Sequence, residues 1–218
     1  VIAVNGRGKR FVNEALSYHE FVRAMLREAN GAADARFHLI CDSRFLWTYG
    51  LGRIRPFTRD LRRHLQSGEL KQATSIAALA GMLELDASAL TATIDDYNQG
   101  ARRGADPQFG RGGTIYQRAL GDPGHKPNPC VAPIEQPAFC ALRIVPADLG
   151  TAVGLKIDGE ARVLRADGSV IAGLFACGND MASIMNGNYP GPGITLGPAL
   201  TFGYIAGRSV VHGSEKPK

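Results

Sequence analysis

The chain has 218 residues, enough for one large domain or two small ones, and its 44% hydrophobic and 21% charged residues exclude extended disorder. The net charge of +5 would suit a nucleic-acid partner, but the arginines are dispersed along the sequence, with no basic run interleaved with aromatic residues. A solvated basic surface is therefore favoured, and we predict no nucleic-acid binding.

The four cysteines, Cys41, Cys130, Cys140 and Cys177, have neither the spacing of a zinc site nor that of a redox dithiol. We therefore predict no metal site and reduced thiols. No apolar run approaches the roughly 20 residues that cross a bilayer, and no signal peptide is recognisable. These features predict a cytoplasmic protein without a transmembrane segment.

The N-terminal third of the chain reads as alternating strand and helix. Val1–Val4 predicts a strand that enters a tight turn at residues 5–8. Ser17 or one of its neighbours is a suitable N-cap for a helix that ends at Asn30 and Gly31. The apolar run Phe37–Asp42 predicts a buried strand.

The middle of the chain predicts an irregular stretch, two helices, a long loop and a strand. Residues 47–58 contain two glycines and a proline and are interpreted as irregular. Helices are expected over residues 75–83 and after the N-cap Asp86. Residues 100–137, rich in Gly, Pro and Arg, predict a long loop, and residues 139–146 predict a strand.

The C-terminal part predicts a strand, a loop and a final helix. A hairpin is expected at Asp167 and Gly168, and Leu174–Cys177 reads as a buried strand that ends at Gly178. A helix is expected over Leu196–His212, with Pro198 tolerated in its first turn. The start of that helix can direct free N–H groups and a positive dipole end at an electron-rich ligand.

The strand, Gly178-Asn179-Asp180, Tyr189-Pro190-Gly191-Pro192-Gly193 and the final helix resemble the C-terminal end of flavoproteins of the fumarate reductase/succinate dehydrogenase superfamily. The 3-ketosteroid Δ1-dehydrogenase branch is the most similar. The resemblance implies FAD as cofactor, held near its flavin by Gly178, Asn179, Asp180, Thr195 and Leu196.

The same resemblance implies an α+β fold. Residues 1–155 would form a substrate (catalytic) domain of the fumarate reductase flavoprotein type, and residues 156–218 the C-terminal piece of a Rossmann-like, split FAD domain. The Gly-rich turn that holds the ADP half of FAD is not recognisable. We therefore expect the N-terminal part of the FAD domain to be missing, and the isolated chain to bind little FAD, to be inactive and to expose apolar surface that favours self-association.

The resemblance also implies catalytic residues. A motif at residues 10–14, Arg-Phe-Val-Asn-Glu, marks the active-site floor in the superfamily, and Tyr18 follows where fumarate reductases place an arginine. The structural alternative for Tyr18 is a tyrosine that packs on its helix with a satisfied hydroxyl. Tyr189 and the N–H of Gly193 would polarise a substrate carbonyl, and Tyr18 would remove the adjacent proton.

Three functions stay open at this stage. The first is desaturation of a cyclic ketone, namely 1,2-dehydrogenation of a 3-ketosteroid, with Tyr18, Tyr189 and Gly193 as catalytic residues. A fumarate reductase-like enzyme acting on an α,β-unsaturated acid is the alternative, although residues 149–151 and 189–193 lack the cations that hold a dicarboxylate. A non-catalytic folded module is the third, and flavin absorbance of the purified chain distinguishes it from the enzymes.

Overall fold

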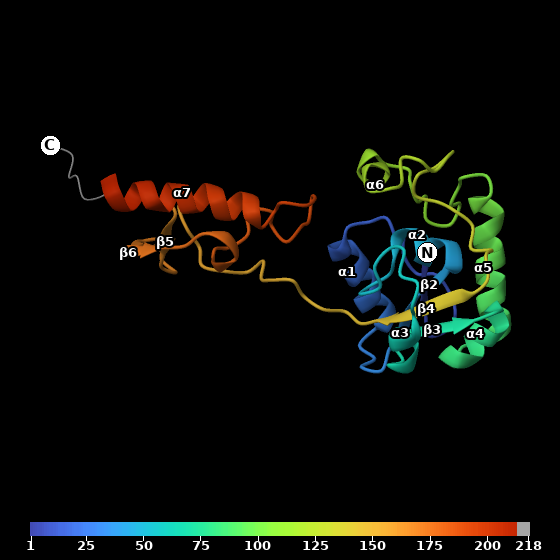
Figure 1. Cartoon of the computed structure of the whole chain (residues 1–218). Helices are drawn as coiled ribbons and strands as arrows, with labels where there is room; N and C mark the ends of the chain where they lie inside the picture. Colours follow the sequence, from blue (N-terminus) through green and yellow to red (C-terminus); the bar gives the residue numbers. More distant parts are fainter. Residues whose placement is uncertain (213–218) are drawn as a thin grey trace. The chain divides into compact units, whose positions relative to one another are not determined.

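The chain folds into two compact units. The structure, a computed structural model, describes residues 1–212. The first unit is Val1–Pro146 and the second is Ala147–Lys218 (Figure 1). Both units contain helices and strands, which confirms a mixed helix and sheet architecture.

A four-stranded antiparallel sheet forms the centre of the first unit. Its strands are β1 (Ile2–Asn5), β2 (Phe37–Asp42), β3 (Leu70–Ala73) and β4 (Phe139–Ile144), in the order β1-β2-β4-β3. The central pair, β2 and β4, is registered with Cys41 opposite Cys140. The sheet therefore brings together β1, from the start of the unit's sequence, and β4, from its end.

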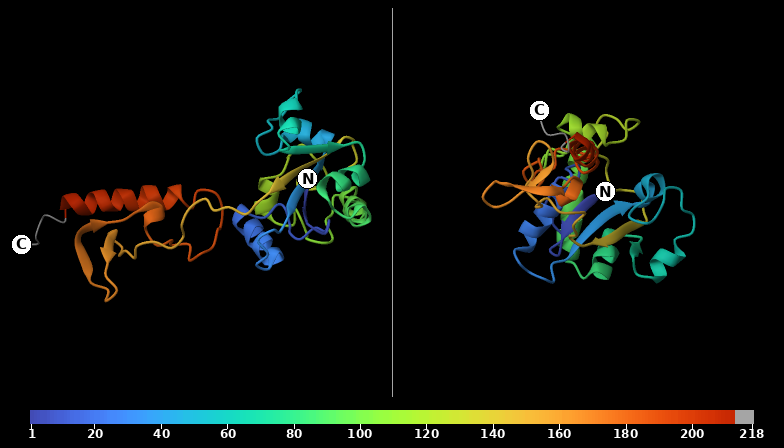
Figure 2. Two further views of the ribbon diagram at one scale, coloured as in Figure 1. Left: turned by 90° about the horizontal axis from the view of Figure 1, so that it is seen from below. Right: turned by 90° about the vertical axis from the view of Figure 1, so that its left-hand side faces the viewer.

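Helices cover both faces of this sheet (Figures 1 and 2). On one face, Ile2 and Val4 of β1 and Ile40 of β2 pack with residues of α4 and α5 to form the main core. On the other face, smaller clusters involve α1 and α2. The helices are α1 (Tyr18–Ala29), α2 (Ser43–Tyr49), α3 (Arg62–Gln66), α4 (Ile76–Leu83), α5 (Ala87–Ala101) and α6 (Ile115–Ala119).

Side-chain caps set several of these helix boundaries. Ser17 accepts a hydrogen bond from the N–H of Glu20 at the start of α1, and Asp86 accepts one from the N–H of Ala89 at the start of α5. Asn30 ends α1 in the left-handed conformation. These boundaries confirm the predicted ones.

Four elements were not predicted: α2, α3, β3 and α6. The interpretation of residues 47–58 as wholly irregular was wrong for Trp47–Tyr49, which complete α2. That helix begins because the carboxylate of Asp42 accepts a hydrogen bond from the N–H of Phe45 at 2.9 Å. It ends at Gly50, whose φ of 73° terminates the helix.

The second unit consists of a hairpin, a 3₁₀ turn and a long helix. Strands β5 (Arg162–Leu164) and β6 (Val170–Phe175) pair antiparallel, the 3₁₀ turn η1 spans Gly178–Asp180, and α7 spans Leu196–His212. The hairpin and α7 are as predicted. The prediction of a buried strand over residues 174–177 was wrong in two respects, since β6 ends at Phe175 and Leu174 is 42% exposed. A two-stranded hairpin leaves part of its surface uncovered within the unit.

The segment before β5 belongs to the second unit. The N–H of Leu155 donates to the carbonyl of Asp180 at 2.9 Å, and the N–H of Ala182 donates to the carbonyl of Leu155 at 2.9 Å. Gly154 permits this approach, because a Cβ there would lie 2.5 Å from the Asp180 carbonyl oxygen. The units consequently divide between Pro146 and Ala147, before the boundary expected at residue 155. None of the helices within residues 1–212 is both long and apolar enough to cross a bilayer.

A buried histidine makes the stability of the first unit depend on pH. His38, on β2, is 4% exposed. Burial, followed by the charges of Arg143 and Arg36, lowers its pKa from 6.5 to about 4. Its neutral form therefore stabilises the fold fully above pH 6.5, and this contribution is lost as pH falls from 6.5 toward 4, because only the unfolded chain binds the proton there.

We predict that lowering the pH from 7 to 5 reduces the free energy of unfolding of the first unit by about 2 kcal/mol through the protonation of His38 alone. Urea denaturation of the chain and of its His38→Leu variant at both pH values measures this contribution. The variant should lose less stability than the parent over this interval. An equal loss in both would show that His38 does not carry the effect.

Candidate active site

Tyr18 is the first residue of α1. Its side chain is 49% exposed, and the buried Ser17 that precedes it caps the helix. The hydroxyl of Ser17 accepts from the N–H of Glu20 at 3.3 Å. Tyr18 thus lies at the positive end of the α1 dipole, with about half of its surface exposed.

A buried network of ions fixes the motif that precedes Tyr18. Arg10 donates to both carboxylate oxygens of Glu14, at 3.0 and 2.7 Å, and to both of Asp106, at 2.8 and 2.7 Å. Arg111 donates to Glu14 at 3.0 Å and to the hydroxyl of Tyr97. The guanidinium of Arg10 lies over the Tyr97 ring, 5.0 Å from its centroid. We call Arg10, Glu14, Tyr97, Asp106 and Arg111 the Arg10 network.

The protonation states of the Arg10 network follow from its hydrogen bonds. Burial opposes charge on Arg10 and Asp106, but their mutual hydrogen bonds outweigh it and raise the pKa of Arg10 while lowering that of Asp106. Burial raises the pKa of Tyr97, so its hydroxyl stays protonated. The two arginines and two carboxylates therefore balance in charge, as a buried site requires.

The Arg10 network anchors the loop that leads to Tyr18. Glu14 also accepts from the N–H of Ala3 on β1 at 2.9 Å. Beside it, Asn13 donates to the carbonyl of Phe109 at 3.0 Å and accepts from the N–H of Ala15 at 2.9 Å. The start of α1 is thereby tied to β1 and to the loop after α5.

We predict that Glu14→Gln destabilises the first unit by about 3 kcal/mol, because two buried arginines then share one remaining carboxylate. Glu20→Gln is the matched control, since Glu20 pairs with Arg23 at the surface and should change stability little. Urea denaturation measures both variants. Similar stabilities for the two would contradict an anchoring role for the network.

In the second unit, η1 packs tightly against the first turns of α7. Gly178 has a φ of 62°, and a Cβ built there would lie 3.2 Å from the Cβ of Ala199. The carbonyl of Asn179 accepts a hydrogen bond from the hydroxyl of Thr151 at 2.9 Å. Gly178 of η1 thus lies against Ala199 in the first turn of α7.

The beginning of α7 leaves backbone donors available. The N–H of Gly197 donates to the carbonyl of Gly193 at 2.7 Å, and that of Ala199 donates to the carbonyl of Thr195 at 3.1 Å. Pro198 has no N–H. Within residues 1–212, the N–H groups of Thr195 and Leu196 donate no hydrogen bond. These donors lie where the helix dipole is positive and can serve an electron-rich ligand.

Tyr189 and Gly193 lie in the loop that connects η1 to α7. Tyr189 is half-buried, and Gly193 has a φ of 98°, a conformation that disfavours any residue with a Cβ. Because the carbonyl of Gly193 accepts the bond from Gly197, the chain enters α7 directly from this glycine. The hydroxyl of Tyr189 and the N–H of Gly193 thus belong to one stretch of five residues.

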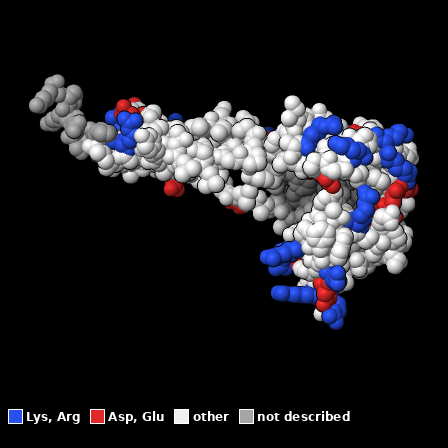
Figure 3. Space-filling model, turned by 45° about the horizontal axis from the view of Figure 1, so that its top comes forward, with Lys and Arg blue, Asp and Glu red and all other residues white. Residues whose placement is uncertain are grey.

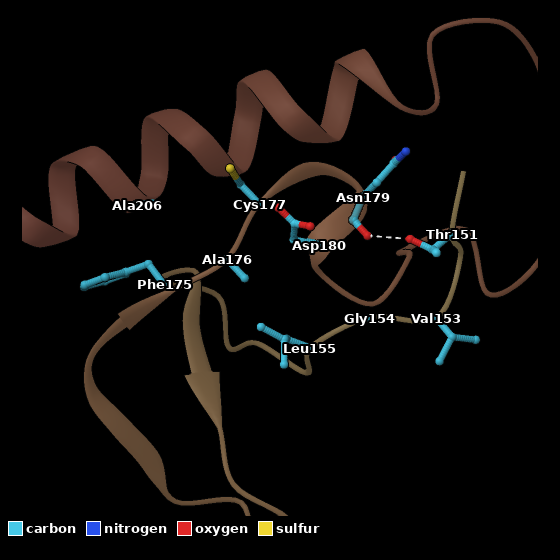
Figure 4. A pocket seen from close by; sticks show the side chains of 10 residues that line it. All are labelled: Thr151, Val153, Gly154, Leu155, Phe175, Ala176, Cys177, Asn179, Asp180 and Ala206. Atoms are coloured by element: carbon cyan, nitrogen blue, oxygen red, sulfur yellow. Dashed lines mark hydrogen bonds between the residues drawn. The ribbon is translucent and has the colours of Figure 1, made fainter. Parts of the chain in front are cut away.

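A cavity of about 570 Å³ opens between η1, the segment before β5 and α7 (Figure 4). The predicted residues Asn179 and Asp180 line it, whereas Gly178, Thr195 and Leu196 do not. Sequence reasoning missed Thr151, Leu155 and Cys177 as lining residues. The sequence does carry a signal for them: Gly150 and Gly154 flank this segment, and both permit close packing of its backbone on η1.

We predict that Gly178→Ala destabilises the second unit by about 1 to 2 kcal/mol, because its positive φ and its contact with Ala199 both oppose a Cβ. The matched control is Gly207→Ala on α7, where a Cβ meets no atom within 4 Å. That variant should be neutral or slightly stabilising. Thermal unfolding of the chain measures both, and equal melting temperatures would contradict the prediction.

Comparison with known proteins identifies the family of the chain. A family model described as "FAD binding domain" matches residues 1–196. This chain belongs to the FAD-binding domain family. The family therefore accounts for residues from both units, including η1, Tyr189 and the start of α7.

Enzymes of named activity match most of the chain. A 3-oxosteroid 1-dehydrogenase of Mycobacterium tuberculosis is 42% identical over 210 residues, which cover 94% of this chain and 37% of the relative. A 4-oxocyclohex-2-ene-1-carboxylate 5-dehydrogenase of Sinomonas cyclohexanicum is 40% identical, over 96% of this chain and 36% of the relative. The chain thus spans little more than a third of the length of these relatives.

A solved structure matches at the level of the fold and of the sequence. The 3-ketosteroid Δ1-dehydrogenase of Sterolibacterium denitrificans, solved in complex with 1,4-androstadiene-3,17-dione, superposes with a TM-score of 0.90 and 38% identity. The match covers 97% of this chain and 38% of the other. A flavocytochrome c3 fumarate reductase at 23% identity and a TM-score of 0.58 shares the fold.

Proposed function

We propose that the chain is part of an FAD-dependent dehydrogenase that desaturates a cyclic ketone, by 1,2-dehydrogenation of a 3-ketosteroid. The observation that carries the proposal is the placement of Tyr189 and Gly193 directly before α7, without a cation between them. A hydroxyl and an N–H suit a neutral carbonyl oxygen, whereas a carboxylate would require positive charge.

The names of the relatives support the substrate class. The oxosteroid and oxocyclohexene enzymes both act on a ring that carries a ketone, and the second substrate also carries a carboxylate. The loop at residues 186–196, which holds Tyr189 and Gly193, contains no Lys, Arg or His. Burying an unpaired carboxylate costs several kcal/mol. This favours the neutral steroid, and it disfavours the alternative of an α,β-unsaturated acid.

The two units have separate roles in this proposal. The first unit, which presents Tyr18, acts as the substrate domain of the fumarate reductase flavoprotein type. The second unit is the C-terminal piece of the Rossmann-like FAD domain. Regions of the relatives that this chain does not match would supply the rest of that domain, so the chain alone is expected to bind FAD weakly and to lack activity.

The second unit fits the flavin end of FAD. Gly178 keeps the backbone of η1 close to α7, and the N–H groups of Thr195 and Leu196 are available at the positive end of the helix dipole. Gly178, Asn179, Asp180, Thr195 and Leu196 would hold the cofactor there. FAD, when bound, supplies the acceptor for the hydride that leaves the substrate.

The chain's own residues then perform the proton chemistry. The hydroxyl of Tyr189 and the N–H of Gly193 donate to the ketone oxygen and acidify the adjacent C–H. Tyr18, as a phenolate or through a relayed proton, removes that proton. The Arg10 network holds the start of α1 in place during this step.

Self-association of the isolated chain also belongs to the proposal. Leu196, Leu200 and Tyr204 on α7 are each more than two-thirds exposed. Apolar side chains in such a row favour contact with another apolar surface. In the whole protein, the remainder of the FAD domain would provide that surface.

We predict that Tyr18→Phe and Tyr189→Phe each reduce turnover of the full-length protein at least about tenfold, as loss of an acid/base group or an oxyanion donor does. Tyr204→Phe is the matched control, because that exposed tyrosine lies on α7 and outside the proposed site. Steady-state turnover with androst-4-ene-3,17-dione measures all three. Unchanged turnover in either site variant would remove that residue from the mechanism.

The substrate class is tested by flavin reduction. Full-length protein is mixed without oxygen with androst-4-ene-3,17-dione, with 4-oxocyclohexanecarboxylate or with succinate, and the bleaching of the flavin band is followed. The proposal expects reduction by the steroid and little or none by the two carboxylates. If 4-oxocyclohexanecarboxylate reduces the flavin faster than the steroid does, the protein is still a ketone dehydrogenase, but the proposed steroid substrate is wrong.

A further inference from the structure

A segment of the first unit holds the net charge of the whole chain. Residues 43–66, which contain α2 and α3, include one acidic residue, Asp60. The net charge of the segment equals the +5 of the entire chain, so the remaining residues are neutral overall. Six of the 19 arginines of the chain lie in this segment of 24 residues, so their density is higher there than in the rest of the sequence. They are Arg44, Arg53, Arg55, Arg59, Arg62 and Arg63, all exposed.

Two aromatic side chains are held outward in the same segment. The N–H of Phe57 donates to the carbonyl of Trp47 at 2.8 Å, and the two rings pack edge to face with centroids 5.6 Å apart. Trp47 is 44% exposed and Phe57 63%. Phe57 has a φ of 62°, which is strained for a bulky residue. The fold thus maintains an unfavourable backbone conformation at an exposed aromatic residue.

A buried anchor makes this surface rigid. Leu51 and Ile54 exchange backbone hydrogen bonds at 2.9 and 3.0 Å, and Ile54 is buried with Leu46 of α2. The residues on both sides of Ile54, Arg53 and Arg55, are consequently both exposed. The basic and aromatic side chains are therefore mounted on a packed scaffold.

Most of these arginines are not neutralised within the chain. Arg53 pairs with Glu69 and Arg62 with Asp60. Within residues 1–212, Arg44, Arg55, Arg59 and Arg63 have no carboxylate partner. Figure 2 shows the segment at the margin of the first unit, and Figure 3 shows basic side chains projecting from that unit. The surface therefore keeps a positive charge that carboxylates within residues 1–212 do not fully neutralise.

We propose that residues 43–66 dock the protein on the surface of an anionic lipid bilayer. Unpaired arginines attract anionic headgroups, and Trp and Phe side chains are suited to the boundary between headgroups and acyl chains. Nucleic acid fits less well, because Trp47 and Phe57 pack edge-on against each other rather than offering parallel faces for bases. The surface includes none of the residues placed in the active site.

The test is cosedimentation of the full-length protein with phosphatidylcholine vesicles, with and without phosphatidylglycerol. Binding should require phosphatidylglycerol and weaken with salt. The double variant Arg55→Glu/Arg59→Glu should bind at least about tenfold more weakly, since each arginine contributes through its charge. Trp47→Ser/Phe57→Ser should also bind more weakly, and both variants should keep turnover on dissolved substrate.

The matched control is Arg27→Glu/Arg103→Glu, which makes the same charge change at exposed sites outside the segment. It should bind vesicles like the parent protein. Thermal unfolding verifies that all variants fold. Equal loss of binding in the control, equal binding to vesicles of phosphatidylcholine alone, or binding to duplex DNA but not to vesicles would each overturn the proposal.

Discussion

The buried pairing of Arg10 with Glu14 and Asp106 is the interaction on which the start of α1 in the first unit depends. Isolated charges at these positions would be too costly to bury, so each group requires the others in place. Because Arg111 joins through Glu14 and Tyr97, the loop after α5 can close only when the motif at residues 10–14 is seated. Order at Tyr18 is thereby coupled to order in distant parts of the unit.

The second unit uses close backbone approach instead of charge. Gly154 and Gly178 allow the segment before β5, η1 and α7 to come nearer than side chains would permit. The contacts are made by main-chain groups and by small residues such as Ala199. The site is therefore shaped by backbone, which suits a ligand bound through N–H groups rather than through ion pairs.

Features encoded locally were predictable, and those set by distant partners were not. Ser17 and Asn30 carry the signals for both ends of α1, and Asp86 carries that for α5. In contrast, β3 is a strand because β4 pairs with it, and no local pattern announces that partner. The motif before Tyr18 was recognisable from its family resemblance, whereas its partners Asp106 and Arg111 became apparent only in the folded unit. The division before Ala147 likewise depends on the bonds between Leu155 and Asp180.

The strand order β1-β2-β4-β3 has a consequence for synthesis of the protein. The strand β4 lies between β2 and β3, yet it is the last of the four to leave the ribosome. Until residues 139–144 emerge, β2 and β3 present unpaired edges, and the core beneath α4 and α5 lacks Ala141. Such nonlocal pairing slows folding and exposes nascent chains to aggregation. The first unit is therefore expected to depend on chaperones during translation more than its size suggests.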